Sequence, residues 1–367
     1  MRYYLWQNKD WQNFPPPNKE LVIPLAKARF LQGQLLTKIA ALDLHLLTET
    51  QNELIVAETM ETSKIEGVEL NPESVRSSVA ERLGLPQGVG IRKDRSVNGL
   101  VDILLDAVHK YNQPLTMSRL NGWHAALFPT GFSGLKKIKA GLLRQGDIQV
   151  VSGHLGREKV HFEAPPSKQA KEDLAIFLKW FNQSFAHEDG LLRAAAAHLK
   201  FVTIHPYDDG NGRLARVITD MAMAQDEKTS FRSYSFSAQI MRERKDYYQI
   251  LEAVQKGSKT LSYWYSWFIN MFSNALQNSQ EIIASVFRKA EFWNIYKDIH
   301  LNERQRKVVQ KMLEIGVFEG GLTTRKYVAM TKTSTPTAAR EIAYLYKKNI
   351  LRQYGQGRSV RYDLNLP

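Results

Sequence analysis

The chain has 367 residues, 43% of them apolar and 24% charged, a balance typical of a globular protein with room for two or three domains. It contains no cysteine, which excludes disulfides and thiolate metal sites, and it shows neither a signal peptide nor an apolar run long enough to span a membrane. From these absences we expect a cytoplasmic protein without membrane partners. The formal net charge is +13.

The N-terminal part of the chain is predicted to be helical. Leucines and isoleucines recur at helical spacing from Phe30 to Ile65, which predicts one long helix that Gly33 interrupts only weakly. Turn-forming residues then predict breaks at 67–72 and 84–90, followed by helices over 94–111 and 116–127.

The centre of the chain combines helices with one β-hairpin. Strands are predicted over 147–151 and 159–162, on either side of the turn-rich sequence SGHLGRE. Two strands this short need a helical body to pack on. An amphipathic helix over 190–204 must end before Pro206, and another helix is predicted over 212–224.

The last 70 residues have a different organisation. Helices are predicted over 301–315, 324–330 and 334–348, and the tail LRQYGQGRSVRYDL is typical of two strands around a Gly-Gln-Gly turn. This order of elements resembles a winged helix-turn-helix domain.

Basic residues are concentrated in this C-terminal segment. Residues 298–367 contain 13 Lys and Arg against 6 Asp and Glu. The basic and polar face of the third helix comprises Arg340, Tyr344, Lys347 and Lys348, and the hairpin carries Arg352, Arg358 and Arg361. Ile342 and Leu345 fall on the opposite face of the helix. A basic recognition helix and wing favour DNA, whereas a protein-docking or dimer-forming module would merely expose the same charges, and both hypotheses stay open.

The segment HPYDDGNGRLAR, which begins at His205, concentrates the chemical groups of the chain. Its Gly-Asn-Gly sequence at 210–212 can adopt positive φ angles that turn backbone N–H groups toward an anion. These residues open a helix, whose N-terminus also favours negative charge. Arg213 and Arg216 share a face of that helix and can bind phosphate oxygens. The segment therefore predicts a phosphate site.

A histidine and two acids complete the segment. The carboxylate of Asp208 or Asp209 would repel a phosphate unless a cation lies between the carboxylate and the phosphate, which predicts Mg²⁺. His205 is a residue type whose unperturbed pKa suits general-base work near neutral pH. Each part also occurs in helix caps, turns and calcium loops, so the prediction depends on the combination of all parts.

The whole segment resembles the signature of the Fic family, which is H-P-F, one free residue, an acid, G-N-G-R, two free residues and Arg. Every constrained position matches except Tyr207, where the family has Phe, so the hydroxyl of Tyr207 needs a partner. The resemblance covers roughly residues 115–270. It includes RQGDIQV and APP, which flank the hairpin, and RKDYYQIL, which is similar to a wall of the family's adenine pocket.

This resemblance implies a Fic fold and the transfer of AMP from ATP-Mg²⁺ to a protein hydroxyl. It implies that His205 is the catalytic base and that Asp209 holds Mg²⁺. The nucleotide-binding residues that it implies are Gly210, Asn211, Gly212, Arg213, Arg216, Tyr247 and Tyr248. Gly212 favours AMP transfer, because Doc relatives that transfer phosphate have lysine there.

The resemblance also implies a docking element for the protein target. The hairpin over 146–162 is the family's flap, which would align the target by adding it as a strand. Ile148 and Val150 are the predicted docking residues.

A second motif lies upstream, at the end of the predicted 30–65 helix. The sequence from Thr62 to Gly67 resembles the inhibitory pattern [S/T]-x-x-x-E-[G/N] of self-restrained Fic proteins. A glutamate at 66 that reaches Arg216 would occupy the guanidinium that the γ-phosphate needs and would repel the nucleotide. Taken alone, the motif is also compatible with an ordinary exposed glutamate beside a helix-terminating glycine.

Together, these patterns predict a mainly α protein in three parts. These are an N-terminal helical region over 1–112 with the inhibitory motif, a Fic core with a β-hairpin flap over 113–275, and a winged helix-turn-helix domain over 298–367. The expected function is a protein adenylyltransferase that acts on Ser, Thr or Tyr and is inhibited by Glu66. The alternatives are a hydrolase that removes AMP and a DNA-binding transcriptional regulator. A homodimer is also compatible with the sequence.

Overall fold

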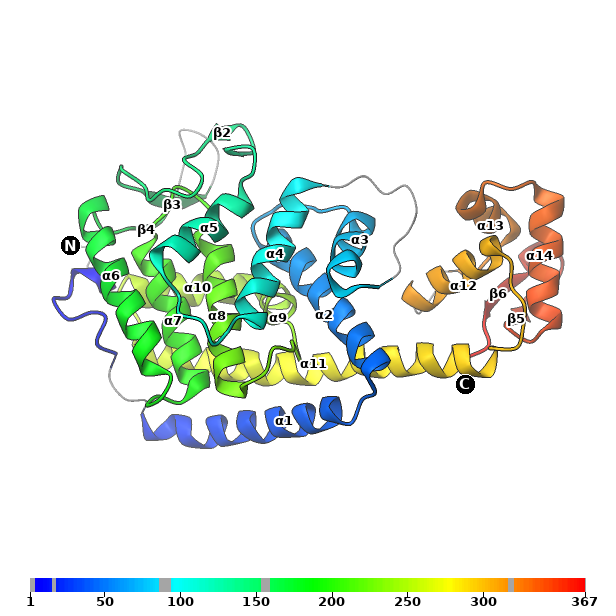
Figure 1. Cartoon of the computed structure of the whole chain (residues 1–367), viewed down its shortest axis with the longest axis horizontal. Coiled ribbons are helices and arrows are strands. Elements are labelled where there is room, and N and C mark those ends of the chain that lie inside the picture. The colour runs from blue at the N-terminus through cyan, green and yellow to red at the C-terminus, as the bar shows by residue number, and fades with distance from the viewer. Residues whose placement is uncertain (1–3, 15–17, 86–93, 153–158, 316–319, 367) are drawn as a thin grey trace. The chain divides into compact units, whose positions relative to one another are not determined.

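The computed structural model describes residues 4–14, 18–85, 94–152, 159–315 and 320–366 (Figure 1). It divides the chain into two compact units, residues 1–282 and residues 283–367. The N-terminal helical region and the predicted core therefore belong to one unit, and both units are mainly helical.

The first unit consists of helices with two short hairpins. Its helices are α1 (Val22–Ala40), α2 (Leu44–Ile65), α3 (Pro72–Leu83), α4 (Arg95–His109), α5 (Met117–Leu127), α6 (Ser167–Ser184), α7 (Gly190–Ile204), α8 (Asn211–Glu227), α9 (Phe236–Arg242), α10 (Arg244–Gln255) and the start of α11 (Leu261–Ile295), with 3-10 turns η1 (Leu5–Gln7) and η2 (Lys19–Leu21). Its strands are β1 (Phe132–Ser133), β2 (Lys136–Lys137), β3 (Gln149–Ser152) and β4 (Lys159–Glu163).

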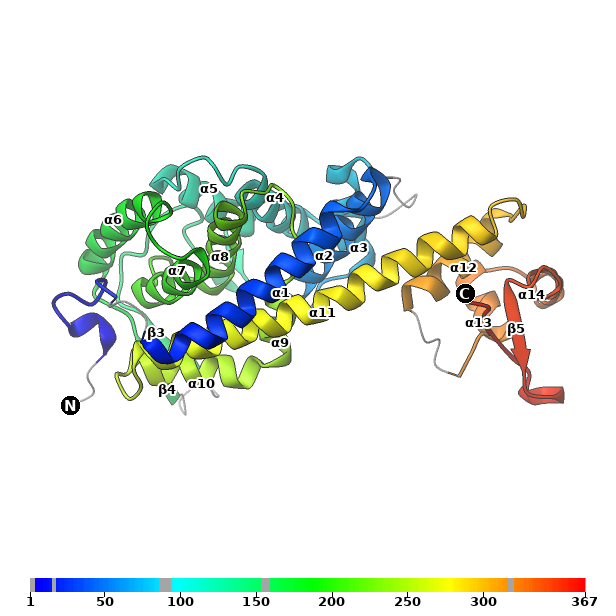
Figure 2. The ribbon, with the colours of Figure 1, turned by 90° about the horizontal axis from the view of Figure 1, so that it is seen from below.

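The prediction of one helix from Phe30 to Ile65 is wrong, because α1 ends at Ala40 and α2 begins at Leu44. The Asp43 carboxylate accepts a hydrogen bond from the backbone N of Leu46 at 2.8 Å and so caps a new helix. The leucine spacing continues across this capping residue, so the spacing does not indicate the boundary between the two helices. The two helices pack on different partners, since α1 lies alongside α11 and α2 packs against α3 and α9 (Figures 1 and 2).

A buried charged network fixes α2 to the rest of the unit. The fully buried carboxylate of Glu58 accepts hydrogen bonds from the backbone N and the hydroxyl of Ser237, and it lies 3.5 Å from Arg232. Arg232 in turn forms an ion pair of 2.6 Å with Asp220 of α8. Because an unpaired buried charge costs several kcal/mol, roughly 3–5 when one partner is removed, the network strongly favours one placement of α2. The end of α2 is thereby held beside α8.

The predicted hairpin and the two central helices are confirmed. Strands β3 and β4 pair in antiparallel register with Val150 opposite Phe162. Helices α7 and α8 pack directly against each other, and the residues between them form the predicted phosphate loop. Residues 86–90 of the predicted break and residues 153–158 of the hairpin turn lie outside the described residues.

The second unit has its own apolar core and contains the elements predicted for it. These are the end of α11, α12 (Glu303–Ile315), α13 (Thr324–Thr331), α14 (Thr335–Lys347), β5 (Leu351–Tyr354), η3 (Gly357–Ser359) and β6 (Arg361–Leu364). Strands β5 and β6 form an antiparallel hairpin, which an isolated bridge extends from Tyr362 to Leu322. The assignment of this unit to the winged helix-turn-helix class stays a prediction.

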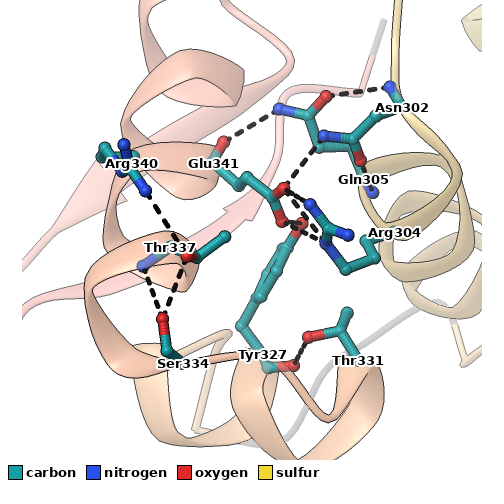
Figure 3. A network of polar contacts seen from close by, with 9 residues as sticks. All are labelled: Asn302, Arg304, Gln305, Tyr327, Thr331, Ser334, Thr337, Arg340 and Glu341. Carbon is teal, nitrogen blue, oxygen red and sulfur yellow. Dashed lines mark hydrogen bonds and ion pairs between the residues drawn. The ribbon is translucent and has the colours of Figure 1, made fainter.

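A polar network supports the packing of α14 against α12 and α13. The carboxylate of Glu341 accepts hydrogen bonds from Arg304 and from the Tyr327 hydroxyl, the latter at 2.8 Å (Figure 3). Arg340, the preceding residue, points away from this network (Figure 3). In the described part of the chain, no helix is long and apolar enough to cross a membrane.

Candidate active site

His205 follows the last residue of α7 and has a left-handed backbone, with φ 50° and ψ 58°. This conformation is uncommon for a residue with a side chain and turns the chain sharply into the loop. The ring Nδ1 lies 3.2 Å from the carbonyl oxygen of Val202 and donates to it, so Nε2 is left as the acceptor. Burial lowers the pKa of His205 to about 4, which keeps the ring neutral at physiological pH. His205 thus has the protonation state that a general base requires.

The loop between α7 and α8 is held by Asn211 and Tyr207. Asn211 accepts a hydrogen bond from the backbone N of Tyr207 at 3.0 Å and donates one to its carbonyl at 2.8 Å. The Tyr207 hydroxyl donates to Asn121 of α5 at 2.7 Å, and the Tyr207 ring stacks on His124. The tyrosine therefore has the partner that its hydroxyl needs in a buried position.

A side chain at Gly210 and one at Gly212 would meet different neighbours in this structure. Gly210 has φ 78°, and a Cβ there would lie 2.8 Å from the Phe128 ring. Gly212 lies in the first turn of α8, where a Cβ would lie 2.3 Å from Oε1 of Glu66. The family resemblance implies that Gly212 binds the nucleotide, and in this structure the Glu66 carboxylate lies beside it.

Arg216 is fully buried, and residues at the end of α2 hold its guanidinium in place. Its Nε donates to the hydroxyl of Thr62 at 2.7 Å, and its Nη2 donates to the carbonyl of Thr62 at 3.0 Å. The same Nη2 lies 2.7 Å from the carboxylate of Glu66. The structure thus brings together the two residues that the motifs connected, while the inhibitory role of Glu66 stays a prediction.

Two buried guanidinium atoms at this site are suited to an anion. The guanidinium of Arg213 lies over the Phe128 ring, at 4.8 Å from its centroid. Among the described residues, neither Nε of Arg213 nor Nη1 of Arg216 has a hydrogen-bond partner. Helix α8 also begins without a side-chain cap at Gly210. Because buried N–H donors of charged groups are nearly always satisfied, this donor set fits the oxygens of a polyphosphate.

Asp209 is placed by its neighbours in the loop and by a hairpin that the sequence analysis did not predict. One carboxylate oxygen accepts a hydrogen bond from the backbone N of Gly210 at 2.6 Å, and the other accepts one from the hydroxyl of Ser133 in β1. A single carboxylate beside a phosphate site fits Mg²⁺, which commonly takes one or two carboxylates together with substrate phosphates. The metal-binding role of Asp209 stays a prediction.

The two tyrosines predicted for the adenine pocket lie in different environments. Tyr247 is buried, and its hydroxyl lies 2.9 Å from Nε2 of His198. Tyr248 is 38% exposed, and its hydroxyl donates to the carbonyl of Ile65 at 3.3 Å. Arg244 donates to the same carbonyl at 2.9 Å, so Tyr248 and Arg244 cap the end of α2. Contact of either tyrosine with adenine stays a prediction.

Ile148 and Val150, the predicted docking residues, pack against a cluster formed by Tyr4, Phe162 and Ala164. Both side chains therefore pack against the protein's own residues, Tyr4 of the N-terminal segment among them. Strand β3 pairs with β4 alone among the described strands, so strand addition at its other edge would use backbone groups. The docking role of the hairpin stays a prediction.

Arg144 is a buried residue of the site to which the sequence analysis assigned no role. Its Nε donates to the carbonyl of His205 at 2.7 Å and its Nη1 to the carbonyl of Gly146 at 2.8 Å. Its Nη2 donates to the carbonyl of Pro165, beyond the hairpin. One guanidinium thus joins His205 to both ends of the hairpin. The motif RQGDIQV contains this arginine, but nothing in its spacing indicates which carbonyls it meets.

Comparison with known families identifies the domain that carries this site. Residues 114–223 match the model of the Fic/DOC family, and this range includes the whole loop from His205 to Arg216. The chain contains a Fic/DOC family domain. A second model, described as a domain of unknown function (DUF4172), matches residues 4–85 and so includes Thr62 and Glu66.

Two curated proteins that the chain resembles are nucleotide transferases. The chain is 33% identical over 116 residues to the uridine 5'-monophosphate transferase of Xanthomonas campestris pv. campestris, which is 30% of this chain and 21% of that protein. It is 35% identical over 79 residues to protein adenylyltransferase fic-1 of Caenorhabditis elegans, which is 21% of this chain and 15% of that protein. The matched segments therefore span only a small share of each relative.

Solved structures share the fold of the chain. A Fic family protein from Desulfovibrio desulfuricans G20 superimposes with a TM-score of 0.55 at 17% identity and covers 96% of this chain and 98% of its own. Fic-1 from C. elegans superimposes with a TM-score of 0.52 at 21% identity and covers 72% of this chain and 73% of its own. These similarities show that the Fic fold surrounds the site.

Proposed function

We propose that the chain transfers AMP from ATP-Mg²⁺ to a Ser, Thr or Tyr hydroxyl of a target protein, and that Glu66 restrains this activity. The observation that carries the proposal is the pairing of a neutral His205 with buried, unpartnered N–H groups of Arg213 and Arg216 at the start of α8. These groups of the described residues support a general base that acts beside a polyphosphate site. The matches to an adenylyltransferase and to a UMP transferase support nucleotide transfer.

The side chains of the loop have complementary roles in the proposed reaction. Nε2 of His205 accepts the proton of the target hydroxyl as its oxygen forms a bond to the α-phosphorus. The bond from that phosphorus to the pyrophosphate oxygen breaks, and Arg213 and Arg216 stabilise the leaving charge. The first-turn N–H groups of α8 orient the phosphates. Asp209 would hold Mg²⁺, which supplies charge neutralisation between phosphates.

Restraint follows from where the Glu66 carboxylate lies. It occupies Nη2 of Arg216 at 2.7 Å and the space beside Gly212, both of which the polyphosphate needs. Its negative charge adds repulsion in a partly buried setting, where Coulomb interactions are stronger than in water. A bound ATP and this position of Glu66 therefore compete.

A hydrolytic activity would use the same residues. The Glu66 side chain is 30% exposed, so it can orient a water toward an AMP group on a modified protein. The two activities respond oppositely to one substitution, since Glu66→Gly raises transfer and removes the group that orients the water.

The test of the proposed function is nucleotide labelling of proteins. Wild type and Glu66→Gly are incubated with Mg²⁺, a cell lysate and either α-labelled ATP or α-labelled UTP. Labelling from ATP that rises in the variant supports AMP transfer. Labelling from UTP alone would show that the transferred group is UMP and not AMP. No labelling from either nucleotide contradicts the proposed function.

DNA binding by the second unit is a second candidate function. Helix α14 buries Ile342 and Leu345 in the core of the unit and exposes Arg340 and Lys347, and Lys348 directly after the helix is exposed as well. Arg352 is exposed on β5, whereas the side chain of Arg358 lies outside the described residues. An exposed basic helix face next to a basic hairpin is suited to phosphate contacts along a DNA groove. A gel-shift measurement at several salt concentrations separates this function from protein docking.

A further inference from the structure

The N-terminal segment, residues 4–14, packs against the β3–β4 hairpin. Tyr4 and Phe162 of β4 are each only 2% exposed, and their rings meet edge to face at 5.5 Å between centroids. The indole Nε1 of Trp6 donates to the carbonyl of Glu163 at 2.8 Å. The Trp6 ring also stacks on Tyr4, so two aromatic side chains hold one strand of the hairpin.

The other end of this segment is attached to the helical body. Gln12 donates to the backbone carbonyl and to the carboxylate of Asp173 on α6, at 3.1 and 3.0 Å. The Phe14 ring faces the buried ammonium of Lys200 on α7 at 4.9 Å. Helix α7 is the helix that ends at His205. The segment therefore connects the hairpin to α6 and to α7, the helix that leads into His205.

The hairpin has an apolar underside that needs this cover. Ile148 and Val150 of the hairpin region pack against the cluster that contains Tyr4 and Phe162. An isolated two-stranded hairpin is marginally stable in water at best. The rings of the N-terminal segment add an apolar surface on this side of the hairpin, while His161 of β4 is paired with Glu252 of α10.

We propose that residues 4–14 are a positioning element that holds the flap hairpin in place for the acceptor protein. The proposal rests on the proposed function, in which the acceptor is aligned at this hairpin. It assigns two tasks to residues 4–85, because residues 4–14 hold the flap and the end of α2 holds Arg216. The acceptor side and the nucleotide side of the site are thus both contacted from one segment.

The test compares Tyr4→Ala with Tyr4→Phe, both in the Glu66→Gly background. The hydroxyl of Tyr4 is buried and has no hydrogen-bond partner among the described residues, so Tyr4→Phe keeps the ring contact and serves as the matched control. Trp6→Phe is a milder second variant, which keeps a ring on Tyr4 but removes the donor to Glu163. ATP-Mg²⁺ binding by calorimetry reports whether each variant retains a folded nucleotide site.

Two measurements give the result. Amide hydrogen exchange is followed over 149–152 and 159–163, and labelling of lysate proteins from α-labelled ATP is followed at increasing lysate concentration. In Tyr4→Ala we expect faster exchange in both strands and labelling reduced about tenfold or more at limiting lysate, since small misplacements of a positioned substrate cost one to two orders of magnitude. The ATP concentration for half-maximal labelling stays unchanged. Trp6→Phe shows a smaller change in the same direction, and Tyr4→Phe behaves like the parent.

Unchanged exchange in Tyr4→Ala contradicts the proposal, as does faster exchange with undiminished labelling. An equal loss in Tyr4→Phe contradicts it too, because that variant keeps the ring. If the Glu66→Gly parent labels nothing, the proposed function fails, and the exchange measurement alone still decides whether the segment holds the hairpin.

Discussion

The guanidinium of Arg216 is held by Thr62 and Glu66, although Arg216 and Glu66 are 150 positions apart in the chain. Thr62 accepts from Nε and Nη2, and Glu66 accepts from Nη2. The two residues lie one helical turn apart at the end of α2, so the helix presents a hydroxyl, a carbonyl and a carboxylate to one buried cation. Restraint in the proposed mechanism therefore depends on the position of the helix as well as on the glutamate.

Thr62→Val is expected to weaken the restraint. The substitution keeps the shape of the side chain but leaves Nε of Arg216 buried without a partner, at a cost of about 1–3 kcal/mol. We expect protein labelling to rise, by less than in Glu66→Gly because the carboxylate remains. Thr59→Val is the matched control, since the Thr59 hydroxyl is also buried in α2 but donates to the carbonyl of Ile55. Equal labelling in both variants would show that the Thr62 hydroxyl does not hold the restraint.

The pH dependence of transfer should reflect the lowered pKa of His205. The neutral ring is the active form, and because burial lowers its pKa to about 4, the neutral form predominates above that pH. Transfer by Glu66→Gly should therefore stay nearly constant from about pH 8 to 5.5 and fall as the pH approaches about 4. A histidine with an ordinary pKa of about 6.5 would lose most of its activity by pH 5.5. A rate profile with its midpoint near pH 6.5 contradicts this expectation.

The metal site is tested by separate substitutions of the two acids. Asp209→Asn removes the charge that would seat Mg²⁺, so nucleotide binding and turnover should fall together when measured across Mg²⁺ concentrations. Asp208→Asn is the matched comparison in the same loop and should have the smaller effect. Activity that is undiminished in EDTA, or a larger loss in Asp208→Asn, would rule out Asp209 as the metal ligand.

DNA binding by the second unit is tested through its salt dependence. Replacing Arg340, Lys347 and Arg352 by alanine should weaken binding and reduce the slope of log affinity against log salt by about one unit for each lost phosphate contact. Lys27→Ala, which removes an exposed charge from α1 in the other unit, is the control. Absence of binding at low salt in the wild type would favour the protein-docking hypothesis.

Local patterns predicted the residues whose chemistry is contained in one short segment. Helices α7 and α8, the loop from His205 to Arg216 and the hairpin could be predicted because capping, glycine and strand signals act over a few residues. The contact between Glu66 and Arg216 could be predicted only through the likeness of both motifs to one family. Local sequence patterns predict no contact between residues 150 positions apart.

The remaining features depend on where distant segments meet. Asp43 caps the start of α2 inside a continuous leucine pattern. Arg144 and Ser133 reach the site through the path of loops, with partners 61 and 76 positions away. Tyr4 covers a hairpin more than 140 positions downstream, and its burial depends on tertiary packing that no local spacing encodes.

Labelling of proteins from α-labelled ATP by wild type, Glu66→Gly and the Glu66→Gly/His205→Ala double variant tests the central claim most directly. Glu61→Gly, which makes the same substitution inside α2, controls for a helix propensity loss of about 1 kcal/mol. We predict weak labelling by wild type and by Glu61→Gly, strong labelling by Glu66→Gly, and none by the double variant, whose ATP binding stays intact. Labelling that does not rise in Glu66→Gly, or that persists without His205, would contradict the account.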